Sequence, residues 1–61
     1  MRIARFKTVS NNTFLINVEH IVSIQGVGGR TLLHDVGGRE TILREDVERN
    51  LSIWKKAYEQ I

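Results

Sequence analysis

The sequence predicts a mainly β, α+β fold: a five-stranded antiparallel meander or SH3-like half-barrel closed by one C-terminal amphipathic helix. Three observations support this prediction. Five short segments are rich in β-branched and aromatic residues, two glycine clusters interrupt the apolar regions, and the apolar period changes from two to 3.6 after Arg44. Residues 1–61 are expected to form a single domain, because no proline-rich or low-complexity stretch suggests a linker.

The first three strands are predicted over residues 3–9, 13–17 and 21–25. Apolar residues alternate imperfectly in the first segment, which is typical of an edge or twisted strand. The second and third segments are dense in Ile, Leu, Val and Phe, so we expect them to be central strands. Residues 10–12 read Ser-Asn-Asn, a polar turn that tolerates left-handed backbone.

The fourth and fifth strands are predicted over residues 30–36 and 39–44, on either side of Gly37 and Gly38. Glycine reaches positive φ without a Cβ penalty, and a two-residue spacing suits a primed turn. The sequence therefore predicts a tight β-hairpin here. The glycines within residues 26–29 are expected to form the preceding chain reversal.

A helix is predicted over residues 47–60, with Asp46 as its N-cap. Ile53 lies off the main apolar stripe, and we interpret it, with Ala57, as a candidate self-association contact. The stripe follows steps of four and three residues and is expected to pack on the sheet as core: Val47, Leu51, Trp54, Tyr58 and Ile61.

The small size of the chain favours self-association. A 61-residue chain buries only about 60% of the surface that its unfolded form exposes, which leaves it marginally stable alone. The sequence has no cysteine, and its two histidines are poor material for a structural zinc site. We therefore expect no cofactor and no metal, and a homodimer or other homo-oligomer as the stabilising device.

No catalytic residue is predicted. His20 and His34 have no cysteine or serine motif around them, and the glycines at 26–29 lack the helix that follows a phosphate-binding loop. Acidic residues at positions 45, 46 and 48 are explained by capping and by the helix dipole. The sequence favours a protein that is not an enzyme.

Positive charge is concentrated in the first half of the chain. Residues 1–34 carry four cations and one anion, and residues 35–61 carry five cations and six anions. One interpretation is a phosphate-binding β surface, and the other is a strand edge protected by charge. The candidate nucleic-acid-binding residues are Arg2, Arg5, Lys7, Arg30 and Arg39.

The longest apolar runs are too short to cross a bilayer, and the first residues lack the pattern of a signal peptide. We expect a cytoplasmic protein without membrane insertion.

Three resemblances follow from the order of the elements. Residues 14–24 read Phe-Leu-Ile-Asn-Val-Glu-His-Ile-Val-Ser-Ile and precede a glycine-containing strand pair, then Arg-Glu-Asp-Val at 44–47 and a helix. This order is similar to the FlbD/SwrD family of very small bacterial flagella-associated proteins, and the same stretch is similar to the β core of LytTR-type DNA-binding domains. The element order also resembles the Sso7d-like archaeal chromatin proteins, which implies an SH3-type fold. The sequence lacks their wedge tryptophan and their high lysine content, so the DNA-bending residues are not carried over.

Two functions remain open at this point. The first is a small non-enzymatic binding or accessory module that self-associates, with a protein partner that the sequence does not identify. The second is a weak, largely sequence-independent nucleic-acid-binding protein that uses the basic β surface.

Overall fold

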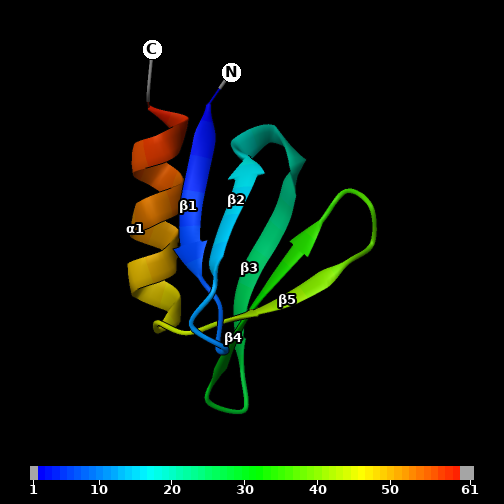
Figure 1. Ribbon diagram of the computed structural model, residues 1–61, viewed down its shortest axis with the longest axis vertical. Helices are drawn as coiled ribbons and strands as arrows, with labels where there is room; N and C mark the ends of the chain where they lie inside the picture. The colour runs from blue at the N-terminus through cyan, green and yellow to red at the C-terminus, as the bar shows by residue number, and fades with distance from the viewer. Residues whose placement is uncertain (1, 60–61) are drawn as a thin grey trace.

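The computed structural model describes residues 2–59 and contains five antiparallel strands and one C-terminal helix (Figure 1). The predicted α+β, mainly β class is confirmed. The predicted helix end at residue 60, and Ile61, lie outside the described residues. The elements are β1 (Ile3–Lys7), β2 (Thr13–Asn17), the 3-10 turn η1 (Val18–His20), β3 (Ile21–Val27), β4 (Arg30–Asp35), β5 (Glu40–Leu43) and α1 (Val47–Tyr58).

The strands form two sheets, β1-β2 and β3-β4-β5. The sheets meet where β1 ends, because Thr8 bridges Leu43 in antiparallel fashion. The Arg44 N–H donates to the Lys7 carbonyl at 2.8 Å on one side of this bridge. Between β2 and β3 the chain turns through η1, where the buried side chain of Val18 occupies the core. Strands β2 and β3 are therefore neighbours in sequence that do not pair with each other.

The turn at Gly37 and Gly38 differs from the predicted two-residue primed turn. The Asp35 carbonyl accepts from the Gly38 N–H at 3.0 Å, and the Asp35 N–H donates to the Arg39 carbonyl at 3.1 Å. This is a three-residue loop with Gly38 in the left-handed region at φ 82°. The carboxylate Oδ1 of Asp35 also accepts from the Gly37 and Arg39 N–H groups, so it caps the loop and ends β4 at Asp35.

A two-residue primed turn occurs instead between β3 and β4. Val27 pairs with Arg30, and both intervening residues have positive φ: 58° at Gly28 and 81° at Gly29. Positive φ at both central positions is what a type I′ turn requires. The longer ladder extends β3 to Val27, two residues past its predicted end.

The first hairpin repeats the three-residue geometry. The Thr8 N–H donates to the Asn12 carbonyl at 2.9 Å, and Asn11 adopts φ 67°. The predicted left-handed polar turn is confirmed, but it begins earlier than expected. Strand β1 therefore ends at Lys7, and Val9 is exposed.

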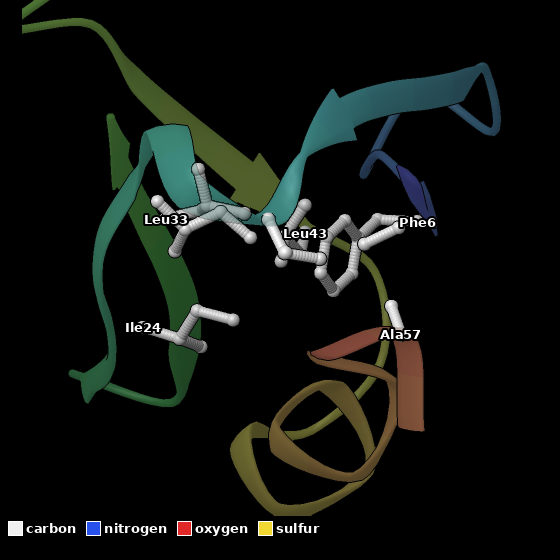
Figure 2. Close-up of a cluster of buried hydrophobic side chains, with 8 residues drawn as sticks. Phe6, Ile24, Leu33, Leu43 and Ala57 are labelled. Carbon is white, nitrogen blue, oxygen red and sulfur yellow. The ribbon is translucent and has the colours of Figure 1, made fainter. Parts of the chain in front are cut away.

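The core lies between the two sheets and α1 (Figure 2). Figure 2 shows the side chains of Phe6, Leu33 and Leu43 above the helix, with Ala57 turned toward Phe6. Packing of this kind excludes voids, and the small Ala57 side chain lets the helix approach β1 closely. The buried hydrophobic residues are Ala4, Phe6, Val18, Ile21, Ile24, Leu33, Leu43 and Ala57.

The helix is rotated relative to the predicted stripe. Val47 and Trp54 pack against the core as expected, but Leu51 is 41% exposed and Tyr58 is 54% exposed. Asn50, a polar residue that the apolar pattern excluded, is fully buried. Its side chain donates to backbone carbonyls at the start of the helix, so a polar residue can occupy this core position.

Candidate functional site

The solvent side of α1 carries an apolar surface, here called the helix patch: Leu51, Trp54 and Tyr58. The three residues follow steps of three and four, so they lie along one side of the helix. They line a shallow hollow of about 400 Å³ together with Lys55 and Glu59. The predicted core role of Leu51 and Tyr58 is therefore wrong, and these side chains are available to a partner.

The two predicted self-association residues, Ile53 and Ala57, pack against the core of their own chain. Ala57 is only 5% exposed and belongs to the core of its own chain. Ile53 is partly buried and packs against that core. The rotation of α1 explains why Ala57 is buried while Leu51 and Tyr58 are exposed. A helix turns about 100° per residue, and neighbouring apolar stripes on it differ by less than that angle. Of the residues on α1, Leu51 and Tyr58 are therefore exposed to solvent, whereas Ala57 is not.

Arg2 holds the end of the helix in place. Its guanidinium donates from Nη1 to the Tyr58 carbonyl at 2.7 Å and from Nη2 to Glu19 Oε2 at 3.1 Å. The same group stacks over the Tyr58 ring, 4.6 Å from its centroid. The charge of this predicted nucleic-acid contact is thus already partnered within the chain.

A second surface lies where β1 meets α1 and is here called the β1 groove. It has a volume of about 590 Å³. Two cations, Arg5 and Lys56, lie along it, and neither forms an ion pair within residues 2–59. Its other lining residues are mainly apolar: Ile3, Ala4, Leu15, Ile53 and Ala57. The groove therefore combines an apolar surface with two available positive charges.

The remaining predicted cations lie elsewhere. Lys7 is on β1, where its Nζ donates to Thr13 Oγ1 at 3.3 Å. Arg30 follows the β3-β4 turn and lines a hollow with Asp46 and Val47 at the start of α1. Arg39 follows the β4-β5 loop, which lies at the side of the molecule away from α1 (Figure 1). Arg39 lines a separate groove of about 410 Å³ with His20 and residues of β2. Arg5 and Lys7 lie on the same strand, whereas Arg2 precedes it and Arg30 and Arg39 follow two different reversals of the chain.

A row of polar side chains crosses the three-stranded sheet, and the sequence pattern did not predict it. Ser23, His34 and Glu40 are cross-strand partners in the register of β3, β4 and β5. Ser23 Oγ lies 3.3 Å from His34 Nδ1, and His34 Nε2 lies 2.9 Å from Glu40 Oε2. Gln25 Nε2, which can only donate, also lies 3.3 Å from Nδ1. This arrangement fits the tautomer in which Nδ1 accepts and Nε2 donates to Glu40.

This row has the serine, histidine and carboxylate order of a hydrolytic triad. Gln25 competes with Ser23 for the nitrogen that would act as base, and the β1 groove and the groove at Arg39 do not include these side chains. Hydrolysis also needs donors placed for an oxyanion. We assign the row to cross-strand pairing on the sheet surface.

Two further observations bear on function. Within the described part of the chain, no group of three or more His, Asp or Glu side chains is placed to hold a metal ion. No helix found between residues 2 and 59 is long and apolar enough to cross a membrane.

No protein-family model, curated protein or solved structure matches this chain. The functional assignment therefore depends on the helix patch and the β1 groove.

Proposed function

We propose that this protein is a small non-enzymatic binding or accessory module that self-associates as a homodimer through the helix patch. The observation that carries the proposal is the exposure of Leu51 and Tyr58 beside the half-buried Trp54. Apolar and aromatic residues grouped on a surface helix are typical of interface centres. The resemblance to the FlbD/SwrD family fits an accessory role of this kind.

The size of the core supports the same proposal. Eight hydrophobic residues are buried among the described residues, and two of them are alanines. A core this small contributes little stabilisation, and small domains without disulfides or metals gain stability by oligomerisation. A second copy that covers the helix patch would bury apolar surface that the isolated chain leaves in water.

Charge around the patch favours an antiparallel pair of helices. Glu48 and Lys55 are both exposed, and neither forms an ion pair within residues 2–59. They lie seven residues, about two turns, apart on the same side of α1. If the two-fold axis passes between Leu51 and Ser52, Glu48 of each copy faces Lys55 of the other, and the two Leu51 side chains meet at the centre. These charges therefore favour a second copy of this chain as the partner that covers the helix patch.

The SH3-like description of the fold is part of this proposal. It is supported by the bridge between Thr8 and Leu43 and by the flanking hydrogen bond from the Val9 N–H to the Ile42 carbonyl at 3.1 Å. Together with the two sheets, this bridge orders the strands β2-β1-β5-β4-β3 around the core. Slow amide exchange at Val9 and Arg44 would support this closure, and exchange as fast as in an unfolded chain would contradict it.

Sedimentation equilibrium of the whole chain from micromolar to millimolar concentration tests the dimer. We expect a reversible monomer–dimer equilibrium, together with a concentration-dependent change in Trp54 fluorescence. A monomer at every concentration would overturn the proposal.

A further inference from the structure

Strand β1 has one edge that is paired along its whole length with β2. The Val18 N–H donates to the Arg2 carbonyl at 3.0 Å, and the Thr8 N–H donates to the Asn12 carbonyl at 2.9 Å. Both hydrogen bonds engage even-numbered positions along β1. Since hydrogen-bonded and non-hydrogen-bonded positions alternate in an antiparallel ladder, the even-numbered residues of β1 direct their main-chain groups toward β2.

The odd-numbered residues direct their main-chain groups to the other edge. Lys7 confirms this alternation, because its carbonyl points away from β2 and accepts from the Arg44 N–H beside β5. The N–H and C=O groups of Ile3 and Arg5 point the same way, and no hydrogen bond between described residues occupies them. These four groups form an unpaired section of the edge of β1, beside α1 (Figure 1), and unpaired edge groups pair readily with another extended chain.

The position of β5 indicates how such a chain would lie. β5 runs antiparallel to β1 but meets it only at the bridge between Thr8 and Leu43 and at the two flanking hydrogen bonds. After Arg44 the chain leaves this edge for the N-cap at Asp46 and enters α1. A guest strand that continues the line of β5 would therefore reach Ile3 and Arg5 and would lie along the β1 groove.

The charges of the groove select the kind of guest. Arg5 and Lys56 are exposed and have no ion-pair partner among the described residues, so a guest with carboxylates would satisfy them. A second copy of β1 is a poor guest. Antiparallel pairing centred on Arg5 would place two arginines opposite each other, and like charges directly opposite destabilise a sheet.

We propose that the β1 groove binds an extended acidic peptide segment of a partner protein by strand addition. The main chain of the peptide pairs with Ile3 and Arg5, its carboxylates contact Arg5 and Lys56, and its apolar side chains cover the exposed Ile3 side chain and the partly buried Ile53. This inference names the partner class of the proposed binding module and rests on that proposal. It does not depend on helix pairing.

The probe is the peptide acetyl-Glu-Val-Glu-Val-Glu-amide, titrated into the isotope-labelled chain and followed by amide NMR. We expect the amides of Ile3 and Arg5 to shift and to exchange about tenfold more slowly at saturation. Arg5→Glu and Lys56→Glu should each weaken binding about tenfold, since each replaces an attraction with a repulsion. Arg30→Glu makes the same change of charge at the β3-β4 turn and should leave the affinity within about twofold.

Methylation of the peptide amides separates strand addition from simple charge attraction. In an antiparallel ladder only alternate peptide N–H groups face β1, so of two peptides methylated on alternating sets of amides, one should lose binding and the other should keep it. Equal affinity of the two peptides, amide shifts confined to the groove at Arg39, or no binding of the unmethylated probe would overturn the inference. Sedimentation measures the dimer separately, so a missing dimer would leave this inference standing.

Discussion

Thr31 and Asn50 donate hydrogen bonds to the same acceptor, the carbonyl oxygen of Glu45. The Thr31 hydroxyl lies 2.8 Å from that oxygen, and Asn50 Nδ2 lies 2.9 Å from it. Both side chains are buried, and the Asn50 amide also donates to the Asp46 carbonyl at 2.9 Å. This junction ties β4 to the start of α1 and sets which side of the helix faces the core. The exposed helix patch follows from it.

Breaking the junction should destabilise the fold. Thr31→Val keeps the shape but removes the hydrogen bond, which should cost about 1 kcal/mol, and Asn50→Ala should cost about 2 to 3 kcal/mol because it also leaves a cavity. Urea unfolding of the single and double variants would measure both values and their coupling. Arg49→Ala, an exposed residue on the side of the helix away from the helix patch, is the control and should stay within about 0.5 kcal/mol. Values near that control for both junction variants would contradict this account.

The corrected turn between β4 and β5 predicts different costs at adjacent glycines. Gly38→Ala forces a Cβ into the left-handed region and should cost about 1 kcal/mol. Gly37→Ala should cost less, since Gly37 is not at positive φ and its Cβ would meet only Asp35 Oδ1, at 3.3 Å. Thermal unfolding of the two variants gives the comparison. A larger loss of stability at Gly37 than at Gly38 would favour the predicted two-residue turn instead.

Replacing Leu51 with lysine should disrupt self-association without unfolding the chain. The side chain is 41% exposed, so the charge remains solvated in the monomer but would be buried in the dimer. We expect the dimer dissociation constant to rise at least about tenfold in sedimentation experiments. Val22→Lys places the same charge on another exposed apolar residue, on β3, and should leave the equilibrium unchanged. An equal effect of both variants would indicate a different interface.

Charge reversal tests the antiparallel register. Glu48→Lys and Lys55→Glu should each weaken the dimer about three- to tenfold by placing like charges opposite each other, and the double variant should recover most of the loss. Lys56→Glu, whose side chain lies outside the proposed helix contact, is the control. Additive rather than compensating effects in the double variant would exclude this pairing of residues.

The elements of the fold could be predicted because their signals are local. The change of apolar period located α1, and Asp46 was recognised as a capping residue by type and position; its side chain accepts from the Arg49 N–H at 2.8 Å. The Asn-rich turn was recognised because Asn11 tolerates left-handed backbone. Each signal comes from a few consecutive residues whose propensities act on the backbone of the same segment.

The surfaces could not be predicted in the same way, because they depend on contacts between distant segments. The row of Ser23, His34 and Glu40 needs the exact register of three strands, and the free edge of β1 needs β5 to leave at Arg44. A pattern of apolar residues treats every asparagine as exposed. Only the carbonyl of Glu45, placed beside Thr31 by the meeting of β4 and α1, makes Asn50 a core residue.

The sequence by itself therefore determined the mainly β class, the presence of a capped C-terminal helix and the positions of the reversals. The tertiary structure decided the rotation of that helix, and with it whether Leu51 and Tyr58 or Ala57 would face the solvent. The physical reason is that contacts between distant segments fix this rotation: Asn50 and Thr31 donate to the Glu45 carbonyl, and Ala57 packs closely in the core. The Asn50 amide donates to the Glu45 and Asp46 carbonyls only once β4 and α1 have met, so an apolar pattern in the sequence cannot anticipate it.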